Sequence, residues 1–304
     1  MSQPNDKCGW SSPTPLVRLR RLQTGPVEIH VKCEWMNPAG SVKDRPAFWM
    51  IRDAEQRGLL AGDSRAILDS TSGNTGIALA QYGAARGHCV TLTMPENAGA
   101  ERKALLRLLG AELILTDPLE GADGARAVAA ALAREQPDRY VYLDQYSNPM
   151  NWRAHYESTA PEIWAQTQGR VTHFASIMGT SGTFTGVSRR LRELNPDIQC
   201  IAVQPDQPYH GIEGTKHYLS TEVPPIFDPQ LVSRQIDIST EEAQTTARQL
   251  ALREGLPANV SGGAAVAAAR RLAAGLSEGV VVTILPDNVM KNLASVADWG
   301  GLES

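Results

Sequence analysis

Lys43 lies at a position in the sequence that could make its amine chemically reactive. Residues 37–45 read NPAGSVKDR and place Lys43 where a helix is expected to begin. The positive end of a helix disfavours an ammonium charge, so this position would lower the pKa of Lys43. A neutral lysine amine can form a Schiff base or act as a general base. The same residue could instead be a solvated lysine paired with Asp44 or Glu34.

Two further segments have the composition of anion-binding loops. Residues 71–76 read TSGNTG and residues 179–183 read GTSGT, and each follows an apolar run and precedes a helical pattern. Unpaired N–H groups and partial positive charge at a helix N-terminus bind phosphate or carboxylate, and glycine allows the anion to approach closely. Either loop alone could be an ordinary helix cap. Two such loops in one α/β chain favour anion binding, although neither matches a Walker A or GxGxxG pattern.

These three motifs, in this order, resemble those of the cysteine synthase family of fold-type II pyridoxal-phosphate enzymes. The resemblance extends from Thr14 to Asp287. Three shorter segments are most similar to cysteine synthase B, namely LDQY at 143–146, AHY at 154–156 and PEIW at 161–164. The implied architecture is α/β, with two domains that each contain a parallel-rich twisted sheet flanked by helices, as in the tryptophan synthase β-subunit. The implied domains are 36–150, smaller and mobile, and 1–35 with 151–304, with the cofactor in the cleft between them.

The resemblance also implies a role for each site residue. Lys43 would hold pyridoxal 5′-phosphate covalently, Asn74 would hydrogen-bond its ring oxygen, and Ser261 would face its pyridine nitrogen. The cofactor phosphate would be bound by Gly179, Thr180, Ser181, Gly182 and Thr183. The substrate α-carboxylate would be bound by Thr71, Ser72, Thr75 and Gln145.

The implied activity is a β-replacement that makes L-cysteine. O-acetyl-L-serine would lose acetate to give an aminoacrylate intermediate, and sulfide or thiosulfate would add to it. A close alternative is replacement with homocysteine, because KCEW at 32–35 and PDNVMKN at 286–292 look more like cystathionine β-synthase. A third possibility is a non-catalytic relative that binds a partner or an anion. The set Lys43, Asn74, Gln145 and Ser261 argues against it, since a scaffold has no need of these side chains.

Two positions differ from the family pattern. Ser181 replaces a glycine of the usual GTGGT loop, and its hydroxyl can add a donor. The loop at 211–218 has Lys216 and His217 where cysteine synthase B has an arginine-rich segment. These two residues could contact an anion or could simply be solvated.

The remaining sequence predicts the elements that position these motifs. Apolar strands are expected at 66–68, 90–94, 113–115, 140–143, 174–178, 198–203 and 280–285, and a half-exposed strand at 27–33. Helices are expected at 44–57, 74–86, 101–109, 124–134, 184–194, 241–254 and 264–272. Such alternation predicts parallel sheets covered by helices on both faces. Residues 205–229 read as a long loop of possible functional importance.

Composition limits the partners and the compartment. The chain has 304 residues, with 29 Lys+Arg against 33 Asp+Glu, and this balance gives no reason to expect nucleic acid or a membrane surface as partner. The four cysteines and six histidines are scattered, without zinc or disulfide spacing. The first residues do not read as a signal peptide, so a cytoplasmic location is expected. The expected ligands are an amino-acid substrate and a sulfur donor, and the family implies a homodimer.

Overall fold

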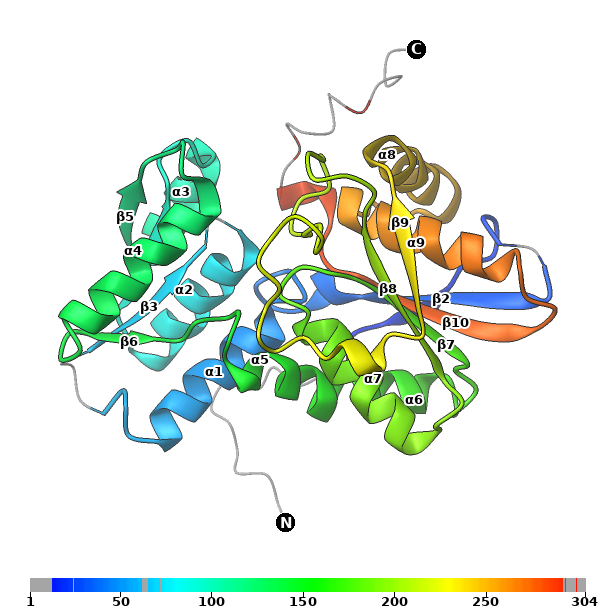
Figure 1. The fold of residues 1–304 in the computed structure, drawn as a ribbon, viewed down its shortest axis with the longest axis horizontal. Coiled ribbons are helices and arrows are strands. Elements are labelled where there is room, and N and C mark those ends of the chain that lie inside the picture. The colour runs from blue at the N-terminus through cyan, green and yellow to red at the C-terminus, as the bar shows by residue number, and fades with distance from the viewer. Residues whose placement is uncertain are drawn as a thin grey trace. The chain divides into compact units, whose positions relative to one another are not determined.

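The computed structural model of the chain forms two compact units (Figure 1). It describes residues 13–23, 25–61, 65–71, 73–291, 293 and 299. One unit comprises residues 43–151, and the other comprises residues 13–42 and the chain from residue 152 onward. The chain therefore passes from one unit to the other between Val42 and Lys43, directly at the lysine singled out by the sequence.

The first unit is built on a parallel sheet. Its strand order is β5 (Glu112–Thr116), β4 (Val90–Pro95), β3 (Ala66–Ser70) and β6 (Tyr140–Tyr142). The connecting helices are α2 (Asn74–Arg86), α3 (Ala100–Leu108) and α4 (Gly121–Glu135), and α1 (Asp44–Gln56) packs on α2. Loops at the carboxyl ends of parallel strands commonly carry ligand sites. The TSGNTG segment lies at such a position, between β3 and α2.

The second unit contains a larger sheet. Its order is β1 (Leu16–Arg18), β2 (Val27–Cys33), β10 (Gly279–Leu285), β7 (His173–Ile177), β8 (Gln199–Pro205) and β9 (Arg234–Ile238). Among the described strands of this sheet, β1 alone runs antiparallel to its neighbour. Helices α6 (Ala160–Gln166) and α7 (Gly182–Leu194) cover one face, and α8 (Thr240–Gln249) and α9 (Val260–Ala273) cover the other (Figure 1).

The predicted fold class, parallel-rich sheets flanked by helices, is confirmed. Some helices start earlier than the sequence predicts. Helix α9 begins at Val260 rather than residue 264 and includes Gly262 and Gly263. A Cβ atom on Gly263 would lie 2.0 Å from the Ala243 carbonyl oxygen, so close packing against α8 requires glycine there. Tertiary packing thus outweighs the low helix propensity of glycine.

The prediction of a half-exposed strand at 27–33 is wrong at Lys32. The Lys32 side chain is fully buried, because α6, which carries Glu162 and Gln166, covers its face of the sheet. Its Nζ donates to the Thr14 carbonyl at 2.7 Å and to Gln166 Oε1 at 2.9 Å, and it lies 2.7 Å from Glu162 Oε2. A buried charge is tolerated when it is paired and hydrogen-bonded in this way.

Helix α5 (Pro149–Ala154), the π-helical segment η2 (His155–Thr159) and α6 form one continuous helical stretch that the sequence does not predict. A second π-helical segment, η4 (Leu250–Glu254), ends α8 inside the range 241–254, which is predicted as a helix. A π-helical turn shifts the hydrophobic phase of a helix, so a period of 3.6 residues does not detect it. Strand β9 was also missed. Short 3₁₀ turns occur at η1 (Glu34–Met36), η3 (Pro229–Leu231) and η5 (Val289–Lys291).

Within the described ranges, no helix combines the length and the apolar character that a membrane crossing requires. The same residues contain no group of three or more His, Cys, Asp or Glu side chains that could hold a metal ion. Cys33, Cys89 and Cys200 have free thiols, and burial raises the pKa of Cys33 to about 12. Cys8 lies outside the described residues.

Candidate active site

Lys43 immediately precedes α1, as the sequence predicts. Its backbone is helical, with φ −77° and ψ −12°, and its carbonyl accepts the Ala47 N–H at 3.1 Å. The side chain is half-buried. Asp44, the first helical residue, is buried and accepts a hydrogen bond from the Tyr82 hydroxyl at 3.3 Å. Lys43 therefore lies at the N-terminal, positive end of α1. The first acidic residue of this helix, Asp44, is hydrogen-bonded to Tyr82 of the same unit.

The loop that precedes Lys43 is held by buried polar side chains. Asn37 donates through Nδ2 to Glu34 Oε2 at 2.9 Å and to the Ser41 carbonyl at 3.1 Å. Glu34 is fully buried and accepts the Thr14 hydroxyl at 2.7 Å. Since Lys32 also donates to the Thr14 carbonyl, the buried lysine and this loop share one polar network.

The same loop is fixed to the end of β10. The Val42 N–H donates to the Pro286 carbonyl at 2.7 Å, and Lys291 Nζ donates to the Ala39 carbonyl. Gly40 has φ +77°, a conformation that favours glycine. The PDNVMKN segment, which differs from the cysteine synthase pattern, is thus part of the support of the lysine loop.

The proposed carboxylate loop connects β3 to α2. The Gly73 N–H donates to Thr71 Oγ1 at 3.1 Å, and Gly73 precedes the helix that starts at Asn74. Asn74 is half-buried in the first turn of α2. The first N–H groups of a helix have no carbonyl partner within the helix, so this turn can bind an anion. Ser72, also predicted to contact the substrate, lies outside the described residues.

Thr75 and Gln145 are 70 positions apart in sequence and are in contact. The Thr75 hydroxyl donates to Gln145 Oε1 at 2.7 Å. Gln145 Nε2 donates to the Ser70 carbonyl at 3.3 Å, and Asn151 Nδ2 donates to the Gln145 carbonyl at 2.6 Å. An amide nitrogen carries two hydrogens, so Gln145 retains a second donor beyond its bond to Ser70. The structure therefore brings together two of the predicted carboxylate contacts.

The GTSGT loop connects β7 to α7 and contains an orphaned hydroxyl. Ser181 has φ +66° and precedes Gly182, the first residue of α7. This left-handed conformation explains why glycine is usual at the position. Ser181 Oγ is buried, and no described group makes a hydrogen bond with it. An unpaired buried hydroxyl at the N-terminus of a 13-residue helix is suited to an anionic ligand.

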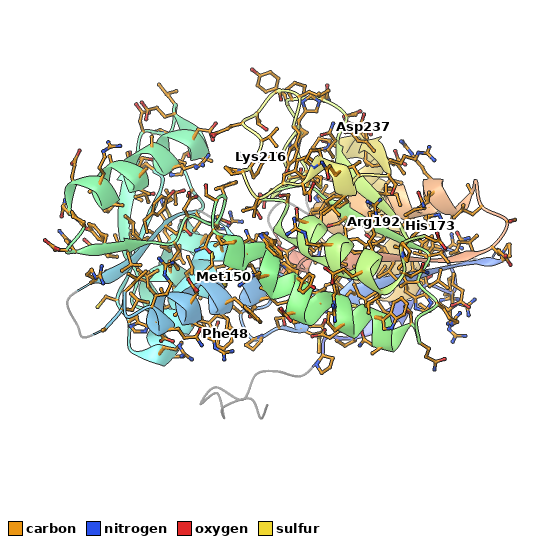
Figure 2. The ribbon with its side chains drawn as sticks, turned by 60° about the horizontal axis from the view of Figure 1, so that its bottom comes forward. Phe48, Met150, His173, Arg192, Lys216 and Asp237 are labelled. Carbon is orange, nitrogen blue, oxygen red and sulfur yellow. The ribbon has the colours of Figure 1, made fainter. Side chains whose placement is uncertain are left out.

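Gly179 gives this loop its close contact with the segment 205–229. A Cβ atom there would lie 2.4 Å from the Gly214 carbonyl oxygen. The Tyr218 hydroxyl donates to the Gly179 carbonyl at 3.0 Å, and the Lys216 N–H donates to the Met178 carbonyl at 2.7 Å. Lys216 is labelled on this segment in Figure 2. The long loop, whose role the sequence left open, thus packs against the GTSGT loop.

A Gly179→Ala substitution is expected to weaken phosphate binding at this loop at least tenfold. The added methyl group would collide with a backbone oxygen, and a backbone cannot move aside as a flexible side chain can. Titration of the protein with pyridoxal phosphate, followed by absorbance, measures the change. Gly275→Ala is the matched control, because its Cβ would lie 3.6 Å from the Leu272 carbonyl, an ordinary contact. Equal affinity in both variants would contradict the assignment.

His155 is a site residue whose contact the sequence did not reveal. It is fully buried in the π-helical segment, with Nδ1 2.9 Å from Thr159 Oγ1 and Nε2 3.2 Å from Thr183 Oγ1. Thr183 is one of the predicted phosphate contacts. In the sequence, the AHY segment at 154–156 shows only a family resemblance. The contact between the buried His155 and Thr183 of the GTSGT loop becomes visible only in the tertiary structure.

Ser261 lies in the first turn of α9 and is buried. Its hydroxyl donates to Asn259 Oδ1 at 2.9 Å, and Asn259 Oδ1 also accepts the Gly262 N–H at 2.8 Å as the helix cap. A serine hydroxyl has one proton. To donate to a pyridine nitrogen, this hydroxyl would have to rotate away from Asn259.

The predicted residues divide between the two units. Lys43, Thr71, Asn74, Thr75 and Gln145 belong to the unit of residues 43–151. Residues 179–183 and Ser261 belong to the other unit. Each unit therefore presents a helix N-terminus with polar side chains, one set expected to bind a carboxylate and the other a phosphate.

A buried carboxyl group next to the carboxylate loop was not predicted. Asp69, near the end of β3, is fully buried, and burial is the largest cause that raises its pKa to about 7. The charge of Asp144 raises the pKa further, whereas backbone hydrogen bonds from Ser70 and Gln145 and the charge of Arg126 lower it. The sequence offered one signal of this buried acid, namely that Asp69 directly follows the apolar run at 66–68.

Comparison with known proteins adds independent information. Residues 10–287 match the family model described as pyridoxal-phosphate dependent enzyme. A cysteine synthase of Aquifex aeolicus is 50% identical over 290 residues, 93% of this chain and 88% of that protein. Cysteine synthase B of Salmonella typhimurium is 47% identical over 278 residues, 90% and 89% of the two chains. The crystal structure of a cysteine synthase from Entamoeba histolytica superposes with a TM-score of 0.91 at 34% identity, covering 100% of this chain and 94% of that one.

Proposed function

Because this chain belongs to the family of pyridoxal-phosphate dependent enzymes, we propose that it makes L-cysteine from O-acetyl-L-serine and sulfide. The family resemblance inferred from the motifs is confirmed, as is the fold-type II class. The observation that carries the activity is the 50% identity, over 93% of the chain, to a protein named cysteine synthase. The polar groups of the two helix N-termini supply the chemistry this reaction needs.

The residues of the second unit fit the cofactor phosphate. The GTSGT loop offers the N-terminus of α7, the orphaned Ser181 hydroxyl and a glycine with no room for a side chain. We assign the phosphate to Gly179, Thr180, Ser181, Gly182 and Thr183, and the ring nitrogen to Ser261. Asn74 and Lys43, from the other unit, would contact the ring oxygen and the aldehyde carbon. The domain bounds expected from the resemblance, 36–150 and 1–35 with 151–304, are part of this proposal.

Lys43 is the group proposed to move the substrate proton. When bound, pyridoxal phosphate supplies an electron sink that makes the substrate Cα–H acidic and allows the β-substituent to leave. The Lys43 amine would accept the proton from the substrate Cα and later return it there. Its place before the first turn of α1 favours the neutral amine that this task requires.

The carboxylate loop orients the substrate. Thr71 and Thr75 lie at the start of α2, Gln145 Nε2 has a second hydrogen beyond its described bond to Ser70, and Ser72 is assigned to the same carboxylate from the sequence. Charge-assisted hydrogen bonds to an α-carboxylate would fix the substrate relative to Lys43. Ser261, a neutral partner for the ring nitrogen, would leave that nitrogen largely unprotonated. A weaker electron sink favours β-elimination over transamination or racemisation.

The sulfur donor and the leaving group are separate choices, and one experiment tests both. The cofactor-loaded protein is expected to form cysteine from O-acetylserine and sulfide, with thiosulfate as a second sulfur donor. Homocysteine is tested in parallel, because the PDNVMKN segment supports the lysine loop and resembles that of cystathionine β-synthase. Serine and O-phosphoserine are the alternative amino-acid substrates. Cystathionine formation that is faster than cysteine formation would overturn the preferred sulfur donor. Cofactor uptake without any turnover would support a non-catalytic role.

We further propose a homodimer in a reducing, cytoplasmic compartment. The dimer follows from the family resemblance, and the compartment is consistent with the free thiols of Cys33, Cys89 and Cys200. Light scattering coupled to size exclusion tests the mass. The expected small-molecule partners are the amino-acid substrate and the sulfur donor.

A further inference from the structure

A buried acid stands directly behind the carboxylate loop. Asp69 is fully buried near the end of β3, two residues before Thr71. Its Oδ1 accepts the Ser70 N–H at 2.7 Å. The Gln145 backbone amide also acts on this carboxyl group, but no described group makes a hydrogen bond of ordinary geometry with Oδ2. A buried carboxylate with one unpaired oxygen is costly unless it holds a proton.

Asp69 is connected to the substrate contacts through one residue. Ser70 donates its N–H to Asp69 and accepts Gln145 Nε2 at its carbonyl. Gln145 in turn accepts the Thr75 hydroxyl. Ser70 therefore links the two side chains: its N–H is held by Asp69, and its carbonyl holds the Gln145 amide that accepts the Thr75 hydroxyl. A change at Asp69 can reach both predicted carboxylate contacts without touching the substrate.

The charges around this acid come from several elements. The ionisable groups that act on it or on its neighbours belong to β6, the loop that follows β6, and α4; they are Tyr142, Asp144, Tyr146, Asp123 and Arg126. The Arg126 guanidinium carbon lies 5.0 Å from the centre of the Tyr146 ring. Asp144 opposes ionisation of Asp69, and Arg126 favours it. The pKa of Asp69 lies at about 7, so the group titrates in the working range of most enzymes.

We propose that Asp69 is a positioning residue whose protonation favours binding of the substrate carboxylate at residues 71–75 and Gln145. The inference rests on the proposed function, since that function assigns the carboxylate to this loop. An ionised Asp69 would place a second negative charge behind the loop, and in a poorly solvated interior like charges repel strongly. A protonated Asp69 removes the repulsion. By linkage, a bound carboxylate must raise the proton affinity of Asp69 by the same factor.

The first test uses the unaltered enzyme and a probe without an amino group. Propionate is titrated into the cofactor-loaded protein at pH 7.5 in buffers of different ionisation enthalpy. Calorimetry is expected to show uptake of a substantial fraction of a proton per propionate bound, and weaker propionate binding as pH rises from 6 to 8.5. Binding without proton uptake at this pH would overturn the proposal. This measurement needs no substitution, so it does not depend on how a variant folds.

The second test uses Asp69→Asn, which keeps the shape and the acceptor oxygen but cannot ionise. Between pH 6 and pH 8.5, the ratio of wild-type KM to variant KM for O-acetylserine is expected to rise roughly three- to tenfold. Ionisation of the substrate changes the KM of both enzymes by the same factor, so it cancels in this ratio. The ratio of kcat values is expected to stay nearly constant with pH. The proton uptake on propionate binding should disappear.

Two further variants separate positioning from general damage. Asp138→Asn removes an exposed carboxylate of the same unit, which contacts no site residue in the described structure, and is expected to keep the wild-type pH profile. Asp69→Glu is expected to retain a pH-dependent KM with a shifted midpoint. A KM ratio that does not change with pH in Asp69→Asn would overturn the inference. In that case cysteine formation by the same preparation would leave the proposed function intact, whereas absence of turnover in the wild type would contradict the function itself.

Discussion

The Lys43→Ala variant is expected to lose the covalent chromophore of the cofactor-loaded protein and at least about a thousandfold in cysteine synthesis. The physical reason is that one amine performs two tasks, binding the cofactor and carrying the Cα proton. No neighbouring residue can replace this amine, because the next two residues, Asp44 and Arg45, are already part of α1. Absorption spectra and single-turnover rates measure the two losses separately.

A matched lysine and a chemical rescue sharpen this result. Lys103→Ala removes a lysine of the same unit whose Nζ donates to the Glu96 carbonyl, and it should retain colour and rate. Added ethylamine should restore part of the rate to Lys43→Ala by replacing the missing base. A Lys43→Ala protein that keeps its covalent chromophore would show that another amine binds the cofactor.

The second large effect is expected at the buried ion pair of the larger unit. Glu162→Gln should lower the free energy of unfolding by about 3–5 kcal/mol, because it removes a carboxylate that lies 2.7 Å from the fully buried Lys32 ammonium. The loss should also loosen the lysine loop, since Lys32 and Glu34 share Thr14 as a hydrogen-bond partner. Denaturant unfolding of the apoprotein measures the stability, and cofactor affinity reports on the loop.

The double variant Lys32→Met with Glu162→Gln provides the control. It removes both charges and keeps an unbranched side chain in the core, so most of the lost stability should return. A Glu162→Gln variant as stable as the wild type would show that the hydrogen bonds of the ammonium to Thr14 and Gln166 suffice without the carboxylate. Equal instability of the single and double variants would instead indicate that the pair acts through packing.

Much of the architecture could be read from local patterns. The apolar runs at β3, β4, β7 and β10 lie in parallel strands flanked by helices, because parallel strands buried on both faces must be apolar. The π-helical segment η2 escaped prediction, since its wider turn breaks the helical period, whereas η4 lies inside the predicted helix 241–254. The burial of Lys32 could not be predicted for another reason. Its partners Thr14, Glu162 and Gln166 are distant in sequence, and the alternation pattern of a strand does not identify them.

The site divides in the same way. Lys43 and the two loops at 71–76 and 179–183 were evident from the sequence alone, because helix starts and glycine turns are local and their chemistry belongs to a few neighbouring residues. Contacts between distant segments were decided by the fold: Thr75 with Gln145, Thr183 with His155, Gly179 with Gly214, and Asp69 behind the loop. Burial and the proximity of charges set the pKa of Asp69, and both arise only when strands and helices pack. The sequence by itself therefore determined which groups are available for the chemistry, and the tertiary structure decided which of them meet and in what state of charge.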